Sequence, residues 1–171
     1  MNQSKKVYGF TLVEALVYIS IFVIIIVFII AFIFWLFQSY TKIKVTKEIL
    51  DNAMRVMDTI SYEIKGADNI YISTSNANQI SLETKRYSSA EEETSYIDFY
   101  ACEDKVCFKK ESQNPFFLIS DKLEVSNLSF TRVVTGGFES VKIDLTMNYK
   151  NPSGREEYES SITLSSNVSL R

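Results

Sequence analysis

An uninterrupted apolar stretch near the start of the chain constrains its fold more than any other feature. Residues 15–37 hold 23 positions without a charge, a glycine or a proline. Because about 20 helical residues cross the hydrocarbon core of a bilayer, this stretch predicts a transmembrane helix. A cleaved secretory signal is the alternative, but its apolar core is shorter and small residues follow it. Here the stretch ends in Trp35, Leu36 and Phe37, so we expect a retained anchor.

The residues after this anchor have a mildly acidic balance of 16 Lys and Arg against 20 Asp and Glu. This balance gives no electrostatic reason to expect nucleic-acid binding. The chain has no histidine, which excludes Ser-His-Asp and Cys-His catalysis and histidine-based zinc sites. We therefore predict no enzymatic activity, no cofactor and no metal, and we interpret Glu91, Glu92 and Glu93 as part of a solvated loop.

One acidic residue, Glu14, lies where the apolar stretch begins. A carboxylate inside a membrane segment costs about 2–3 kcal/mol at the helix centre and less near the interface. Partial hydration among the headgroups is one way to accommodate it. Pairing with a cation is the other, and cleavage after Gly9 would supply one as a free amino group on Phe10. That amine could belong to the same chain or to a neighbouring copy.

The order of Lys5, Lys6, Gly9, the sequence from Phe10 to Glu14 and a long apolar helix resembles the class III signal of type IV prepilins and pseudopilins. The resemblance implies that a membrane-embedded aspartyl peptidase cleaves between Gly9 and Phe10. It also implies N-methylation of the new terminal Phe10 and a role for Glu14 in setting the register of assembly. The glycine suits a cleavage point because its missing Cβ lets the backbone enter a narrow groove.

Location and partners also come from this resemblance. It implies a single-pass protein of the bacterial cytoplasmic (inner) membrane, with a cytoplasmic N-terminus and an extracytoplasmic C-terminal domain. The positive charges alone would not orient the span, because Lys42, Lys44 and Lys47 follow it. The implied partners are other pilin or pseudopilin subunits, the prepilin peptidase/methyltransferase, the inner-membrane assembly platform and membrane lipid.

Helical periodicity continues beyond the membrane. No glycine or proline interrupts residues 10–65, and Gly66 follows as a predicted helix stop, so one continuous helix is predicted. Charged residues of its second half, Glu63 among them, are expected to face solvent. An apolar stripe with three- and four-residue spacing predicts packing on a sheet, although a coiled-coil seam is the alternative: Ile49, Ala53, Val56, Met57, Ile60 and Ile64.

The pattern then changes to period two, which is typical of antiparallel strands with one buried face. The clearest strand covers residues 141–149, and a second one returns from Tyr158, which together predict a C-terminal hairpin. Turns are predicted at Gly136–Gly137 and at 151–157, and an exposed loop at 85–95. Weaker strands are predicted at 79–84, 96–101, 106–110 and 123–133.

The two cysteines, Cys102 and Cys107, lie in the sequence ACEDKVCF. If Asp104 and Lys105 form a two-residue turn, the cysteines face each other across a hairpin and a disulfide is feasible. Two free thiols or half of a metal site are the alternatives, and the absence of histidine disfavours metal. A disulfide would fit an oxidising compartment.

These patterns predict an α+β, pilin-like fold: a long N-terminal helix, half transmembrane and half amphipathic, packed on an antiparallel β-sheet. The predicted parts are a leader, a transmembrane helix, its amphipathic continuation and a sheet domain, at 1–9, 10–37, 38–66 and 67–171. Residues 55–70 with the closing hairpin resemble a minor J-type pseudopilin or the corresponding minor pilin. We expect a subunit of a type IV pilus or a type II secretion pseudopilus, and the alternative is a solitary anchored binding module that does not polymerise.

Overall fold

The computed structural model describes residues 9–88 and 93–170. Helix α1 (Leu12–Gly66) is its longest element, and it contains no proline and no glycine before its last residue. The helix begins at Leu12 rather than at Phe10 as predicted, because Thr11 caps it. The chain forms two compact units, one ending at Tyr40 and the other beginning at Thr41, and α1 contributes to both.

The described part of the first unit consists of α1 and the residues directly before it. Its large apolar side chains from Phe10 to Phe37 are 38–81 % exposed, so the chain itself does not cover them. The most apolar window of α1 has a mean hydropathy of 3.4, which makes α1 long and apolar enough to cross a membrane. A lipid bilayer or neighbouring helices would supply the cover that this surface needs.

The second unit begins with the amphipathic part of α1. All six residues of the predicted apolar stripe are buried, and Val45 extends it by one more turn. The prediction that the stripe packs on a sheet is confirmed, because these residues share one hydrophobic core with the strands. Glu63 is also buried, which contradicts its predicted exposure.

Two antiparallel sheets replace the single sheet that the sequence suggested. Five strands pair in sequence order, and each strand is antiparallel to the one that precedes it in the chain. The predicted strands at 79–84, 96–101 and 106–110 are confirmed to within one residue at each end. The five strands are β1 (Asn69–Ile70), β2 (Gln79–Thr84), β3 (Ser95–Cys102), β4 (Lys105–Lys110) and β5 (Phe116–Phe117).

The second sheet contains β6 (Leu123–Thr135), β7 (Phe138–Tyr149) and β8 (Ser161–Ser169), in that order. Buried and less buried residues alternate along β7 as predicted, and β8 pairs with it to complete the C-terminal hairpin. The last strand begins later than predicted, because Tyr158 lies in a 3₁₀ helix (Glu156–Tyr158) and stacks on Tyr149 with ring centroids 5.7 Å apart.

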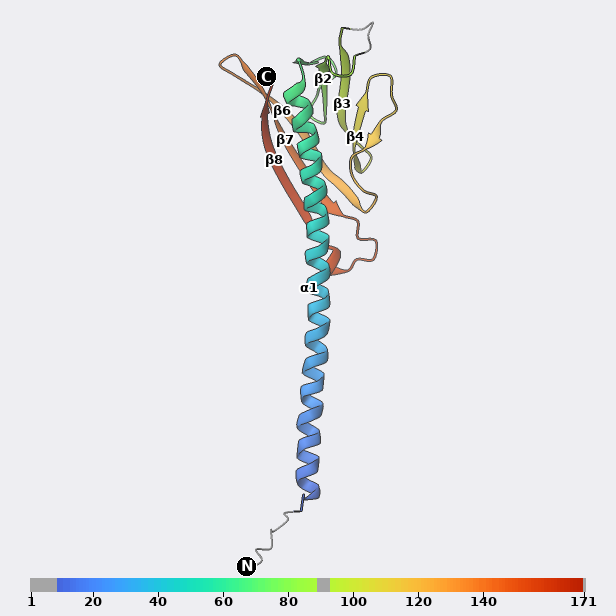
Figure 1. Ribbon diagram of the computed structural model, residues 1–171, viewed down its shortest axis with the longest axis vertical. Coiled ribbons are helices and arrows are strands. Elements are labelled where there is room, and N and C mark those ends of the chain that lie inside the picture. Colours follow the sequence, from blue (N-terminus) through green and yellow to red (C-terminus); the bar gives the residue numbers. More distant parts are fainter. Residues whose placement is uncertain (1–8, 89–92, 171) are drawn as a thin grey trace, which may run out of the picture. The chain divides into compact units, whose positions relative to one another are not determined.

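Figure 1 shows the Thr41–Gly66 part of α1 running alongside the sheet of β6, β7 and β8. Near the start of β8, the Thr46 and Ser160 hydroxyl groups lie 3.0 Å apart. The inward residues of β7, among them Ile143 and Leu145, are fully buried. Burial of an aliphatic side chain contributes about 1.5–3 kcal/mol, so the face between α1 and this sheet is a main source of stability.

The turn predictions had mixed outcomes. Gly136 and Gly137 join β6 to β7 with positive φ angles of 61° and 84°, as a tight hairpin turn requires. The segment 85–95 is not wholly exposed, since Tyr87 is half-buried and Ser95 is buried in β3. Outside the described residues lie the leader up to Tyr8, with Lys5 and Lys6, and part of the predicted acidic loop, with Glu91 and Glu92.

Candidate functional site

The start of α1 is organised by Thr11 and Glu14. The Glu14 backbone N–H donates to the Thr11 Oγ1 at 3.3 Å, and the Ala15 N–H donates to the Thr11 carbonyl at 3.1 Å. Thr11 is therefore the N-cap and Glu14 is the third helical residue, which is the spacing of a capping box. Thr11 was not among the predicted site residues. The Thr-x-x-Glu spacing in the sequence is the signal that indicates this cap.

Gly9 and Phe10 lie just before the helix in non-helical backbone. Phe10 is 68 % exposed, and its ring lies 5.5 Å from that of Tyr18. A Cβ built on Gly9 would meet no described atom within 4 Å. The described fold therefore does not require glycine at this position.

Glu14 is exposed on the first turn of α1. The partial positive charge of the helix N-terminus favours a carboxylate there by about 0.3–1 kcal/mol. Among residues 9–88 and 93–170, no lysine or arginine forms an ion pair with it. In the isolated chain, the helix end is thus the favourable electrostatic partner that the geometry offers this acid.

Cys102 and Cys107 form a disulfide in the second unit, with their Cα atoms 5.8 Å apart. The predicted bridge is confirmed, but the predicted turn is wrong by one residue. Cys102 pairs with Lys105, so the two-residue turn consists of Glu103 and Asp104, and Glu103 adopts a positive φ of 56°. The cysteines consequently lie diagonally across the hairpin rather than directly opposite each other.

Replacing both cysteines with alanine is expected to lower the free energy of unfolding by about 2 kcal/mol, since the bridge closes only a short loop. Chemical denaturation of the full chain in detergent micelles would measure this change. Treating the unaltered chain with a reductant should produce a similar loss, whereas the alanine variant should not respond to it. Equal stability of the two chains under oxidising conditions would contradict the expectation.

Glu63 is the most deeply buried charged side chain of the described residues, at 5 % exposure. The Arg86 Nη1 donates to one carboxylate oxygen at 3.1 Å, and the Tyr87 hydroxyl donates to the other at 2.7 Å. These partners belong to the segment after β2. The cluster of Glu63, Arg86 and Tyr87, called the acid clasp below, thus joins the last turn of α1 to the five-stranded sheet.

Two neighbouring residues complete the surroundings of the acid clasp. The Arg86 guanidinium lies over the Tyr62 ring, 4.5 Å from its centroid. A Cβ on Gly66 would clash with that guanidinium, and Gly66 lacks a positive φ. The helix ends at Gly66 as predicted, without a left-handed residue there, and the missing Cβ makes room for Arg86. Burial, and then the hydrogen bond to Glu63, raise the pKa of the Tyr87 phenol above its usual value.

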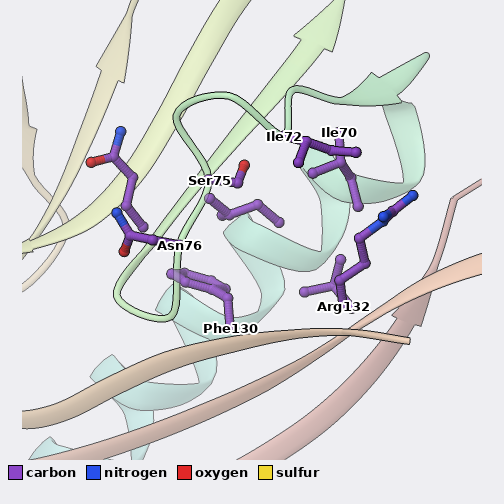
Figure 2. A pocket seen from close by; sticks show the side chains of 9 residues that line it. Ile70, Ile72, Ser75, Asn76, Phe130 and Arg132 are labelled. Carbon is purple, nitrogen blue, oxygen red and sulfur yellow. The ribbon is translucent and has the colours of Figure 1, made fainter. Parts of the chain in front are cut away.

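A cavity of about 250 Å³ opens between the segment after α1 and the β6–β7 hairpin (Figure 2). Its apolar walls include Ile70, Ile80, Phe130 and Val141, each no more than 7 % exposed. Arg132 lies at its edge. A cavity with such walls suits a small apolar group. The sequence does not predict this cavity, because its walls come from distant parts of the chain.

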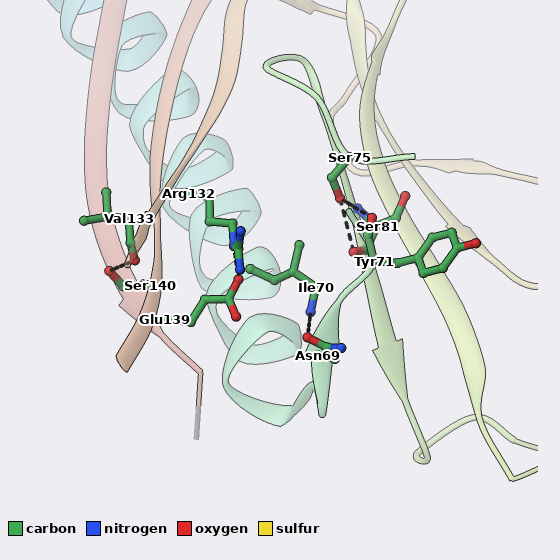
Figure 3. Close-up of polar contacts among 9 residues, drawn as sticks. All are labelled: Asn69, Ile70, Tyr71, Ser75, Ser81, Arg132, Val133, Glu139 and Ser140. Atoms are coloured by element: carbon green, nitrogen blue, oxygen red, sulfur yellow. Dashed lines mark hydrogen bonds and ion pairs between the residues drawn. The ribbon is translucent and has the colours of Figure 1, made fainter. Parts of the chain in front are cut away.

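Polar groups around this cavity are engaged within the chain (Figure 3). The Ser75 hydroxyl donates to the Tyr71 carbonyl at 2.8 Å and accepts the Ser81 N–H at 3.0 Å. Arg132 forms an ion pair with Glu139. Among the described residues lining the cavity, these contacts place no base beside a nucleophile.

Comparison with known proteins bears on the N-terminal segment. Residues 4–30 match the family model of the prokaryotic N-terminal methylation motif. No curated protein and no solved structure matches the chain. The matched range includes Gly9, Phe10, Thr11 and Glu14, so these four residues form one candidate site at the start of α1.

Proposed function

We propose that this chain, which carries a type IV prepilin-like class III signal peptide and one helix long and apolar enough to cross a membrane, is a membrane-anchored minor pilin or pseudopilin. Its proposed role is structural: the subunit is incorporated into a filament and catalyses no reaction. The single observation that carries the proposal is the matched motif at residues 4–30, with Gly9, Phe10 and Glu14 in their places.

Processing is the first step. Prepilin peptidase hydrolyses the peptide bond between Gly9 and Phe10, and the methyltransferase methylates the new amino group of Phe10. The exposure and non-helical backbone of both residues support this step, because a peptidase must reach an accessible, extended bond. The described fold does not require glycine at position 9. The proposed reason for Gly9 is that a residue without a Cβ fits the narrow groove of the peptidase.

Assembly is the second step. The apolar side chains from Phe10 to Phe37 pass from lipid to contact with the same helices of neighbouring subunits. The Glu14 carboxylate pairs with the Phe10 amine of the next subunit, since an acid in an apolar environment needs a cation. Copies that are out of register leave this acid unpaired, so the pair sets the register.

The proposed orientation places the leader in the cytoplasm and the domain after the anchor outside the bacterial inner membrane. The assembly platform in that membrane is then the proposed partner during insertion. As a minor subunit, the chain would act at the tip and help to initiate a type II secretion pseudopilus, a pilus or a DNA-uptake filament. A solitary anchored binding module is the second candidate, favoured by the apolar cavity of Figure 2.

Mass spectrometry of the mature N-terminus tests the proposal. We expect a chain that starts at Phe10 and carries one added methyl group. The Gly9→Ala variant should keep its leader and stay out of filaments, whereas Glu14→Gln should be cleaved normally. A native chain that still begins at Met1 would contradict processing, and a processed chain that never enters filaments would favour the binding module.

A further inference from the structure

Most strand edges of the two sheets are protected against pairing with another chain. The five-stranded sheet ends in β1 and β5, which have only two residues each. The outer edge of β6 is engaged at two positions, because the Val125 N–H donates to the Asp104 carbonyl at 2.7 Å and the Phe130 N–H donates to the Ala77 carbonyl at 2.8 Å. Short and covered edges are the usual protection of natural sheets.

The outer edge of β8 has no such protection in the described chain. The Leu170 N–H donates to the Glu139 carbonyl at 3.0 Å, and the Tyr149 N–H donates to the Ser160 carbonyl at 3.2 Å. Even-numbered residues of this strand therefore face β7, since backbone direction alternates along a strand. The backbone groups of the odd-numbered residues point to the open side, without a backbone partner among the described residues: Ser161, Thr163, Ser165, Asn167 and Ser169.

The composition of β8 also leaves it open. Its nine residues include no charge, no proline and no glycine, and its register with β7 runs without a bulge from Ser161 to Ser169. Lysine, proline and bulges are the devices that normally block an exposed edge. On the side of the sheet that faces the core, Ile162 and Leu164 are only partly buried, whereas their β7 neighbours Met147 and Leu145 are fully buried.

We propose that β8 accepts an extended strand from a different protein chain. That strand would be uncharged where it meets β8, matching its uncharged edge, and apolar on the face that covers Ile162 and Leu164. Backbone hydrogen bonds would supply the affinity and the apolar side chains the specificity, as in other strand-addition complexes. The proposal does not rest on cleavage, on Glu14 or on filament formation.

A second copy of the chain is the less suitable occupant. The described residues of a second copy offer β8 as a long edge without backbone partners, because β1 and β5 are short and β6 is engaged at Val125 and Phe130. Antiparallel pairing of two β8 strands reverses the second copy, including its Thr41–Gly66 helix that runs alongside β8 (Figure 1). Two chains anchored in one membrane enter their domains from the same side, so this arrangement does not suit them.

Residue-level hydrogen exchange of the full chain in detergent micelles tests the proposal. The probe is a peptide of the length of β8 that alternates valine and threonine and carries a terminal lysine for solubility. We expect saturating peptide to slow exchange of outward amides such as Thr163 and Ser165 by about tenfold or more. The inward amides of Ile162 and Leu164 should stay slow throughout. Unchanged outward rates would overturn the proposal.

Matched variants at Asn167 assign the binding to the edge. Asn167 is exposed and its N–H points outward, so proline removes an edge donor without removing a bond to β7. We expect Asn167→Pro to weaken peptide binding about tenfold and Asn167→Thr to leave it unchanged, with both variants melting like the unaltered chain. If the proline variant does not fold, a peptide with N-methylated backbone amides serves instead, because it lacks N–H groups that would donate to the edge of β8. Binding of this peptide as tightly as the unmethylated one would overturn the proposal.

Chain concentration distinguishes the two occupants. With a different chain as the partner, the outward amides of β8 exchange rapidly without peptide at every concentration of the full chain. If they become protected as the chain is concentrated, and Asn167→Pro removes this protection, then a second copy occupies the edge. That result would overturn the proposal of a different partner chain.

Discussion

Replacing Glu14 with alanine is expected to leave cleavage after Gly9 largely intact and to reduce incorporation into filaments by at least about tenfold. The expected loss follows from one charge-assisted contact, which is worth about 1.5–3 kcal/mol, because 1.4 kcal/mol changes an equilibrium tenfold. The measurement compares the amount of processed chain in purified filaments with the amount that remains in the membrane. Asp58→Ala, which removes an exposed acid from the same helix, serves as the matched control.

A second pair of variants separates charge pairing from helix capping. Glu14→Gln keeps the shape of the side chain and the hydrogen bond from the residue 14 backbone N–H to the Thr11 Oγ1, but it removes the charge. It should therefore fail to assemble as severely as the alanine variant. Thr11→Ala removes the cap and should have the weaker effect. If Thr11→Ala reproduces the defect while Glu14→Gln assembles normally, Glu14 matters for the helix start and the proposed pair is wrong.

Replacing Glu63 with alanine is expected to lower the free energy of unfolding of the domain after the anchor by about 3 kcal/mol. Removal of one partner from a buried ion pair typically costs about 3–5 kcal/mol. The lower end applies here, because the Arg86 side chain is 34 % exposed and water can hydrate its released charge. Denaturant unfolding of the full chain in micelles, followed by near-ultraviolet circular dichroism, would measure the change.

Glu63→Gln refines the same test, because an amide can still accept a hydrogen bond from Tyr87. We expect it to lose about 1–2 kcal/mol, between the alanine variant and the unaltered chain. Asp58→Ala, an exposed acid one turn earlier, should stay within about 0.5 kcal/mol of the unaltered chain. An alanine variant at Glu63 as stable as this control would show that the acid clasp contributes nothing to stability.

The features of the fold that the sequence predicted correctly follow from local periodicity. The spacing of Ile49, Val56 and Ile60 specified the buried side of α1, because helical periodicity survives in any context that offers an apolar partner. Alternation along 141–149 specified β7 in the same way. The N-terminal motif was equally readable, because Gly9, Phe10 and Glu14 are neighbours in the sequence.

Long-range contacts could not be predicted by the same reasoning. Glu63 lies beside the stripe, and its partners Arg86 and Tyr87 follow 23 and 24 residues later, so nothing local marks it as buried. The division into two sheets depends on which strands pair, and periodicity carries no such information. The displaced cystine turn depends on the positive φ of Glu103, which a glutamate seldom adopts.

The disulfide of Cys102 and Cys107 closes a loop with a sequence separation of five and joins no other elements. Under mechanical load, only the few residues between the two sulfurs are shielded from extension. Nearly the whole contour length of the domain therefore becomes available once the strand ladders and the packing of α1 give way. The resistance of the domain to a pulling force is accordingly set mainly by non-covalent contacts, and reduction of the disulfide adds only these few residues to the extended length.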